Sequence, residues 1–484
     1  MGFKFVLLWT DVALWLLFAA LAGYVLHVRR SAPLRATWLK VLRDPAALCS
    51  ALVLLLFLSV TALDSVHFRR ALPAAAGQAA GQVFYDNRAE SLLDLALSRP
   101  LAMRESTYSA PLATHAFGKQ VVTRPDGETV REFPRLQHGG AHLRDPARDR
   151  QADVVRRAAT GAAGGLVVAL LASGLLAWAL RRTHGGVGAA WCDIAADRTT
   201  LPLRALVLTF AVVCVVAGAV VALMGHYHVF GTDRTGNDVL VQTLKSVRTA
   251  FVIGALSTLA TLPIAITLGI LAGWFRGWVD EVVQYLYTTL SSVPSVLLIA
   301  ACVLMVQVWL DKHPDWFETG VERADLKVFL LCAILGATGW STLCRLVRAE
   351  TLKLRELDFV QAAQAFGVGP LRIMRRHIFP NVVHLVLITT VLSFSELILY
   401  EAVLTYVGVG VDPSTSSFGG MINLARSEMS RDPVVWWSFA AAFGFMVVLV
   451  LAANLFADGV QQAFDPRARA LRPRPNFLRK RAAP

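Results

Sequence analysis

Long apolar runs separated by short polar stretches form the main pattern of this chain. Nine of the runs have about the length, roughly 20 helical residues, that crosses the hydrocarbon core of a bilayer. The pattern therefore predicts an all-α polytopic membrane protein with about nine transmembrane helices. The nine runs are 5–28, 46–63, 160–180, 205–225, 250–275, 282–310, 328–346, 382–404 and 436–455.

Residues 65–157 form one polar stretch that is far longer than the connections between the other runs. Its length predicts a small folded α/β or β insertion on the external side of the membrane. The predicted division of the chain is 1–64, a pair of transmembrane helices; 65–157, the external insertion; 158–204, a transmembrane helix and a cytoplasmic loop; 205–466, a transmembrane core; and 467–484, a basic cytoplasmic tail.

Basic residues gather beside the apolar runs, most clearly in the short loop 29–43. The positive-inside rule places this loop in the cytoplasm, with the N-terminus outside and the C-terminus inside. The net charge of +13 therefore reflects membrane topology and does not indicate nucleic acid. The basic tail is expected to attract anionic membrane lipid, at about 1 kcal/mol per residue. With 55% hydrophobic residues and a mean hydropathy of +0.53, the composition excludes an ordinary soluble chain.

The stretch 358–381, which we call the elbow, is polar although it lies between two apolar runs. Asp358 and Gln361 have the spacing of a helix N-cap and its capping-box partner. Gly367 can take the left-handed conformation that ends a helix, and Pro370 suits the first turn of the next one. The elbow is therefore predicted to be helix, sharp turn, helix. Three apolar residues are expected to share one face of its second helix: Leu371, Met374 and Ile378.

The elbow resembles the EAA–G–I-x-L-P motif of permease subunits of binding-protein-dependent ABC importers. Gln361 stands where that motif has Glu, so the charge is lost, and Phe379 stands where it has Leu. The resemblance implies a type I permease core in 205–466, in which 358–381 is the loop that couples the permease to an ATPase. The implied ATPase-coupling residues are Asp358, Gln361, Ala362, Ala363, Gly367, Ile378 and Pro380.

A second segment, 230–240, resembles the FGTDxxGRDxLSR sequence of oligopeptide, dipeptide and nickel permeases of the C type. Thr232, Asp233 and Asp238 can cap the helix that follows, and Gly236 permits a tight turn. The later segments 401–410 and 458–467 also resemble this family. The positions that match its pattern are predicted to be structural: Gly231, Thr232, Asp233, Gly236, Asp238, Glu401, Gly408, Gly410, Asp465 and Pro466.

Ionisable groups inside the predicted spans are the other candidates, because they must face the bundle interior or water. Asp11 is expected to face other helices. Glu396 is a candidate for the translocation path, or else makes an ordinary interhelical hydrogen bond. His138 and His142 lie four residues apart, but no third potential metal ligand follows at a suitable spacing. His226 and His228 are interpreted as external polar residues. No metal site is predicted, and the six cysteines show no metal-ligand spacing.

The sequence contains no Gly-rich phosphate loop ending in Gly-Lys-Ser/Thr and no nucleophile elbow, so the chain is predicted to be a transport subunit and not an enzyme. The resemblance implies a multi-pass protein of the bacterial inner membrane and an import of peptides or similar solutes. It also implies three kinds of partner: a second homologous permease, two ATP-binding subunits that hold ATP and Mg²⁺, and an external solute-binding protein. No cofactor is expected in this chain itself.

Two other classes of function remain open at this point. An ion-coupled secondary transporter would use Glu396 and would work without ATP. A membrane-anchored sensor would bind its ligand through the region 65–157, and changes in the elbow would leave it intact.

Overall fold

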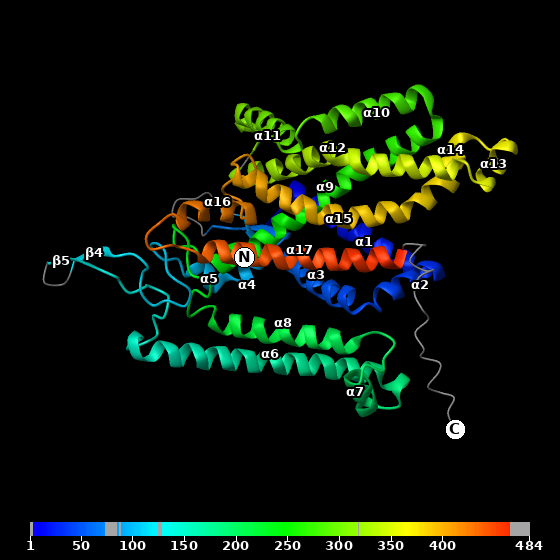
Figure 1. The fold of residues 1–484 in the computed structure, drawn as a ribbon. Coiled ribbons are helices and arrows are strands. Elements are labelled where there is room, and N and C mark those ends of the chain that lie inside the picture. The colour runs from blue at the N-terminus through cyan, green and yellow to red at the C-terminus, as the bar shows by residue number, and fades with distance from the viewer. Residues whose placement is uncertain (1–2, 73–84, 87–88, 124–127, 318, 465–484) are drawn as a thin grey trace, which may run out of the picture.

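The computed structural model describes residues 3–72, 85–86, 89–123, 128–317 and 319–464. Long helices lie roughly side by side in it (Figure 1). Within these described ranges, nine helical segments are long and apolar enough to cross a membrane, as the hydropathy pattern predicted. They are α1 (Trp9–Arg30), α3 (Pro45–Asp64), α6 (Pro146–His184), α8 (Leu203–Leu223), α9 (Val239–Phe275), α11 (Ser295–Lys312), α12 (Gly320–Arg355), the segment Pro370–Tyr406 that ends in α15 (Phe379–Tyr406), and α17 (Trp437–Phe464).

Shorter helices connect or cover these segments. They are α2 (Ala32–Val41), α4 (Leu92–Ala96), α5 (Ser98–Ala102), α7 (Val187–Ala195), α10 (Gly277–Ser292), α13 (Asp358–Ala365), α14 (Pro370–Ile373), α16 (Phe418–Met429), the 3₁₀ turn Pro314–Trp316 and the π turn Met374–Ile378.

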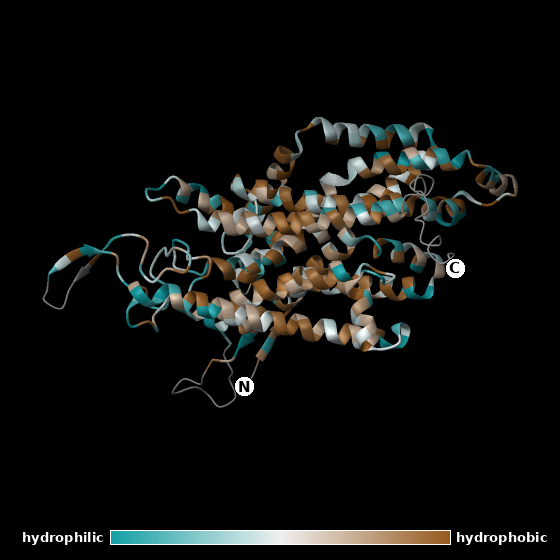
Figure 2. Ribbon diagram, turned by 60° about the horizontal axis from the view of Figure 1, so that its bottom comes forward, coloured by the Kyte–Doolittle hydropathy of each residue, from teal (hydrophilic) through white to brown (hydrophobic). Residues whose placement is uncertain are grey.

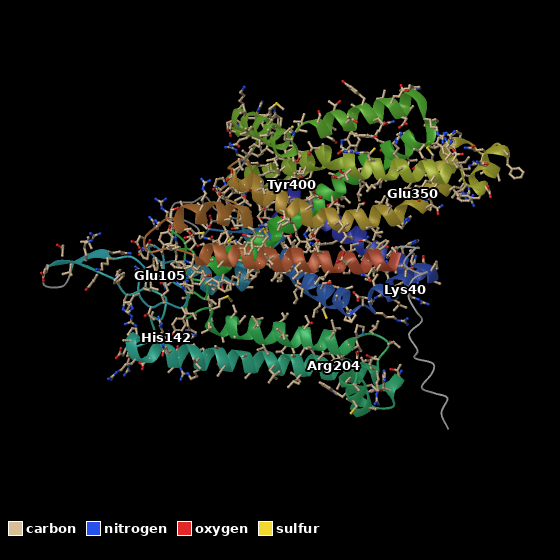
Figure 3. The ribbon with its side chains drawn as sticks, viewed as in Figure 1. Lys40, Glu105, His142, Arg204, Glu350 and Tyr400 are labelled. Atoms are coloured by element: carbon tan, nitrogen blue, oxygen red, sulfur yellow. The ribbon has the colours of Figure 1, made fainter. Side chains whose placement is uncertain are left out.

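Hydrophobic residues concentrate along the middle of the bundle, and hydrophilic residues concentrate toward its two ends (Figure 2). Lys40, Arg204 and Glu350 lie toward one end, which also carries α13 and α14 and which we call the elbow end (Figures 1 and 3). Glu105 and His142 lie toward the opposite, insertion end (Figure 3).

The region at the insertion end contains little sheet. Strand β2 (His67–Arg70) pairs antiparallel with β1 (Phe3–Val6) on one side and β3 (Glu90–Ser91) on the other. A separate hairpin joins β4 (Gln120–Thr123) to β5 (Thr129–Glu132). The N-terminal residues thus form part of this sheet, and for this reason α1 begins at Trp9 and not at residue 5. Helix α6 begins at Pro146, so the predicted boundary at residue 157 lies inside a helix.

Helices α6 and α8 pack closely through small residues. A Cβ atom added to Gly165 would collide with the Cys214 carbonyl, and one added to Gly161 would collide with the Gly218 carbonyl. Glycine at these positions therefore allows the two backbones to approach, as small residues do between membrane helices.

The predicted single span 282–310 is wrong. The chain instead forms α10 and α11, separated at Val293 and Pro294. Val293 has an extended conformation (ψ 134°), because a following proline disfavours the helical conformation of the residue before it.

A buried ionic cluster fastens α1 to the rest of the bundle. Arg248 on α9 lies with its Nη2 atom 2.6 Å from Asp11 Oδ1 and 3.7 Å from Asp325 Oδ1 on α12. Asp11 Oδ2 is also 2.7 Å from Nδ1 of His67. Asp11 is 3% exposed, so it faces other elements, as expected for a carboxylate in a spanning segment.

Candidate functional site

The elbow is a helix, a sharp turn and a second helix, as predicted. Helix α13 is closed by Gly367, whose φ of 74° is left-handed. The Gly367 N–H donates to Gln364 O (2.9 Å), and the Val368 N–H donates to Ala363 O (3.0 Å). Pro370 occupies the first turn of α14. The whole unit projects from the elbow end of the bundle (Figure 1).

The predicted capping box is wrong. Helix α13 begins at Asp358 itself, after an extended Leu357, and no side chain caps it. The Gln361 side chain instead donates from Nε2 to the carbonyl oxygen of Glu356 at 3.2 Å. The end of α12 leaves this carbonyl within reach, because the last C=O groups of a helix have no partner inside the helix.

Three apolar side chains anchor the elbow to the bundle. Val360, Ile373 and Ile378 have no exposed surface and belong to one core cluster with residues of α9, α12 and α15. Leu371 was expected on this face, but it is 76% exposed and Ile373 takes its place. The π turn Met374–Ile378 explains the difference, since its wider i→i+5 turn shifts the register of an ordinary α-helix.

The elbow also presents an apolar surface to its surroundings. Phe366 is 87% exposed beside the Gly367 turn, and with Leu371 it forms what we call the elbow tip. Arg372, Arg375 and Arg376 line an open hollow of about 930 Å³ next to the tip. An exposed apolar patch with a polar rim is typical of a protein interaction site.

The residues assigned to ATPase coupling divide between the two sides of the elbow. Ala363 is half-buried against the core cluster, and Ile378 is fully buried in it. The others are exposed: Asp358, Gln361, Ala362, Gly367 and Pro380. Phe366, the most exposed apolar side chain of the elbow, is not among the coupling residues predicted from the sequence. The available signal was an aromatic side chain placed directly before the turn.

Polar contacts fix the base of the elbow to α9 and to the start of α10. Glu356 Oε1 lies 2.5 Å from Arg276 Nη2, and Arg355 donates to the Trp274 carbonyl at 2.7 Å. Arg348 on α12 pairs with Asp280 on α10, Nη2 to Oδ2, at 2.7 Å. The hydrogen bond from Arg348 lowers the pKa of Asp280 and keeps it charged. These contacts connect the base of the elbow to α9 and α10.

At the insertion end, the segment 230–240 forms a turn that leads into α9. Asp238 caps this helix as predicted, accepting from the Leu240 N–H at 2.8 Å, and Gly236 has a φ of 77°. Asp233 instead holds the turn by accepting from the N–H groups of Thr235 and Asn237. Thr232 accepts from the Ser109 N–H at 2.6 Å, so neither Thr232 nor Asp233 is a helix cap.

His228 is buried among ionised side chains, so the expectation of an ordinary polar residue is wrong for it. It is 1% exposed, with Nδ1 2.8 Å from Asp238 Oδ2 and Nε2 3.4 Å from Glu105 Oε1. Burial opposes its charge, but the hydrogen bond with Asp238 and the nearby Glu105 carboxylate prevail and raise the pKa of His228 to about 9.

Glu105 joins this cluster to the rest of the insertion. Its carboxylate accepts from the backbone N–H groups of Gln137, His138 and Gly139 at 2.9 to 3.0 Å. Burial would raise the pKa of Glu105, but His228 and these three donors lower it to about 2. Sequence spacing gave no signal for this contact, because Glu105 lies far from His228 along the chain. The described part of the chain contains no group of three His, Cys, Asp or Glu residues arranged to hold a metal.

The two glutamates of α15 have different surroundings. Glu401 is 1% exposed and accepts from Thr405 Oγ1 at 2.8 Å, close to Gly410. Glu396 is exposed, and no hydrogen bond or ion pair to it occurs within the described residues. Gly231 and Gly408 have left-handed φ values of 73° and 89°. Asp465 and Pro466 lie outside the described residues.

A bundle of long apolar helices, with an anchored helical elbow projecting from one end, is typical of a multi-pass membrane protein. The family profile described as "binding-protein-dependent transport system inner membrane component" matches residues 265–470. The chain belongs to this family, and it is therefore a permease component of the inner-membrane, multi-pass type.

Two relatives carry the assignment. The oligopeptide transport system permease protein OppC of Mycobacterium bovis is 32% identical over 248 residues, which are 51% of this chain and 79% of the relative. A putative peptide permease protein of Brucella suis biovar 1 is 31% identical over 244 residues, 50% of this chain and 74% of the relative. Both alignments cover about half of this chain, which is longer than either relative.

Proposed function

We propose that this chain is the permease subunit of an ATP-driven importer and that its elbow docks on an ATP-binding subunit. The observation that carries the proposal is the combination of an exposed tip, Phe366 and Leu371, with a fully buried anchor, Val360, Ile373 and Ile378. Burying apolar surface contributes about 25 cal/mol per Å², so the tip supplies affinity. The buried anchor holds the elbow rigidly on the bundle, so a movement of the ATP-binding subunit would be transmitted to the bundle helices.

The route of transmission follows the contacts at the elbow base. The core cluster joins the elbow to α9, α12 and α15, and the pairs Arg276–Glu356 and Arg348–Asp280 hold α9 and α10 to α12. Closure of the ATP-binding subunits would shift the elbow and, through these contacts, the bundle. In the proposed cycle, ATP and Mg²⁺ are bound by the partner subunits, and the bundle alternates between outward and inward opening.

The proposed assembly contains a second homologous permease, two ATP-binding subunits and an external solute-binding protein. The elbow end would face the cytoplasm and the insertion end the exterior, with the N-terminus outside and the C-terminus inside. Lys40 and Arg204 at the elbow end support this orientation, because basic residues favour the cytoplasmic side (Figure 3). The core would be 205–466, with 1–64, 65–157 and 158–204 as additions to it.

The proposed solutes are peptides or related small molecules. The support is that the two relatives are named as oligopeptide and peptide permeases. Glu396 is proposed to line the translocation path, since an exposed carboxylate within a spanning helix must face water or another protein.

Copurification from native membranes tests the docking. The wild-type chain should bring down an ATP-binding subunit and a second permease, and Phe366→Ser should lose the ATP-binding subunit while it keeps normal abundance. Phe133→Ser is the matched control, because Phe133 is also exposed but lies in the insertion. Recovery of no ATP-binding subunit with the wild-type chain would exclude the proposal and leave ion coupling or ligand sensing to be tested.

A further inference from the structure

Strand β1 and the residues that join it to α1 carry a row of exposed apolar side chains. Successive side chains of an extended chain point to opposite faces, so alternate residues share one face. Leu8 is 3% exposed, whereas its neighbours on the other face are 54% to 82% exposed. We call these neighbours the aromatic strip: Phe3, Phe5, Leu7 and Trp9.

The register of the sheet places the aromatic strip on its outer face. Phe5 lies directly opposite Phe68 of β2, and the ring of Phe3 packs edge-to-face on Phe68 with 5.3 Å between the ring centres. Directly opposed residues of antiparallel strands point to the same side, so these rings share one face. Arg70 lies opposite Phe3, so a charged residue marks the end of the strip farthest from α1.

The inner face of the sheet is held by ion pairs. His67 Nδ1 lies 2.7 Å from Asp11 Oδ2 of α1, and Arg69 Nη2 lies 2.9 Å from Glu322 Oε1 of α12. These contacts fix the inner face against the two helices. The aromatic strip therefore points away from the bundle.

The aromatic strip continues the exposed surface of a membrane-spanning helix. Trp9 is the first residue of α1, and Val12 and Leu16 are exposed on the same helix. At about 100° per residue, these two side chains lie within about 60° of Trp9 around the helix axis. Lipid is expected to cover this face of α1, and the strip extends the same surface toward the insertion end.

The backbone of β1 limits the depth of the aromatic strip. Within the described part of the chain, β1 pairs with β2 along one edge, and no strand lies along its other edge. The N–H and C=O groups of a free edge need water or lipid head groups as partners, because hydrocarbon offers none. An apolar face beside such an edge suits the head-group layer, where both kinds of contact are available.

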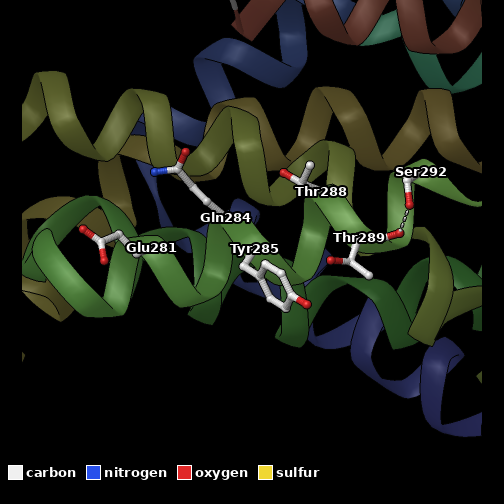
Figure 4. A pocket seen from close by; sticks show the side chains of 6 residues that line it. All are labelled: Glu281, Gln284, Tyr285, Thr288, Thr289 and Ser292. Carbon is white, nitrogen blue, oxygen red and sulfur yellow. Dashed lines mark hydrogen bonds between the residues drawn. The ribbon is translucent and has the colours of Figure 1, made fainter.

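Other exposed surfaces of the bundle differ in kind. Helix α10 borders an open hollow with polar side chains such as Glu281, Gln284 and Thr288, which water can satisfy (Figure 4). The aromatic strip offers no side-chain hydrogen-bonding group except the indole N–H of Trp9. Exposure of such a surface to water is costly.

We propose that the aromatic strip lies in the head-group layer of the membrane leaflet on the insertion side and contacts phospholipid there. Aromatic side chains are enriched at both membrane–water interfaces, where a ring can bury its apolar body and an indole N–H can reach a polar partner. The contact anchors the N-terminal strand, and through it the beginning of α1. This inference goes beyond the proposed function and does not depend on the docking of the elbow.

Lipid and aqueous quenchers test the position of the aromatic strip. Bimane is attached to Phe5→Cys, or to Leu7→Cys as a second position, in the full-length chain with its native cysteines replaced by alanine. Val121→Cys is the matched control, because Val121 is also an exposed apolar strand residue but belongs to the hairpin that projects from the insertion end (Figure 1). The protein is placed in vesicles of phosphatidylethanolamine and phosphatidylglycerol. They contain either phosphatidylcholine with a doxyl group near its head or iodide in the water on both sides.

We expect the doxyl lipid to quench bimane at positions 5 and 7 at least about threefold more strongly than at position 121, and iodide to do the reverse, because interfacial side chains contact lipid. Quenching of positions 5 and 7 by iodide to the same degree as position 121 would place the strip in water and overturn the inference. Protection from both quenchers would show that protein covers the strip, which also overturns it.

Hydrogen exchange of the β1 amides in the same vesicles tests whether lipid holds the strand. Phe5→Trp and Phe5→Gln both remove the native ring, but only tryptophan suits the interface. We expect residues 3–6 to exchange at the wild-type rate in Phe5→Trp and at least about threefold faster in Phe5→Gln, because loss of the anchor favours local opening. Val121→Gln should leave these amides unchanged. Equal acceleration in both Phe5 variants, or none in Phe5→Gln, overturns the lipid contact.

Discussion

At the residue scale, the conformation of a few positions decides what the elbow can do. Gly367 allows the chain to reverse within a few residues, so that α13 and α14 lie close enough for Val360 and Ile373 to enter one core cluster. A Cβ atom at Gly367 would meet nothing within 4 Å. Only the left-handed backbone therefore makes glycine necessary there.

Gly367→Leu tests this interpretation. The larger side chain disfavours a φ of 74°, so we expect the elbow to lose its turn while membrane insertion and chain abundance stay near the wild-type level. Uptake in membrane vesicles should fall to background. Gly369→Leu is the control, because Gly369 has a φ of −60° and open space around it. Normal uptake with Gly367→Leu would contradict the mechanical role of the elbow.

His228 and Glu105 give the insertion a predictable dependence on pH. The raised pKa of His228 stabilises the folded insertion fully below its ordinary value of 6.5, and this contribution is lost as the pH rises toward about 9. The lowered pKa of Glu105 acts in the other direction, and its contribution is lost as the pH falls from 4.5 toward about 2. We expect protease resistance of the insertion to decline between pH 6.5 and 9.

His228→Gln should abolish this decline. His115→Gln is the control, because His115 is exposed, and it should retain the decline. An unchanged pH profile in His228→Gln would show that His228 does not cause the pH dependence.

At the scale of elements, hydropathy and turn chemistry predicted much of the structure. The nine spans and the elbow follow from apolar length and from Gly367 and Pro370, which act locally. The expectations that were wrong concern positions where the structure is determined by contacts between distant residues or by helix register. Leu371 turns outward because of a π turn, residues 3–6 join a strand distant in the sequence, and His228 is buried by the insertion. The segment 282–310 is predicted as one helix because a hydropathy average does not detect the break in the helix before Pro294.

The ionic cluster between α1, α9 and α12 leads to a prediction about stability. Arg248→Met removes the cation that faces Asp11 and Asp325, and uncompensated buried carboxylates should lower the free energy of unfolding by about 3–5 kcal/mol. Arg323→Met is the control, because its pair with Asp311 is exposed and worth less than about 1 kcal/mol. Thermal denaturation in detergent measures both variants. Equal melting temperatures would show that the cluster does not hold α1 in place.

At the scale of the whole molecule, the two ends of the bundle differ in what they present to partners. The elbow end carries an apolar tip on a buried anchor, and the insertion end carries a sheet and loops tied to α9 through Asp238 and His228. In the proposed assembly, the elbow tip contacts an ATP-binding subunit.

Photo-crosslinking at position 366 tests this contact. A benzoylphenylalanine in place of Phe366 is irradiated in native membranes that contain the assembled importer, and the same group at Phe133 serves as the control. The account predicts an adduct between position 366 and an ATP-binding subunit, and none between position 133 and that subunit. Adducts of position 366 with lipid alone, or no adduct, would contradict the account.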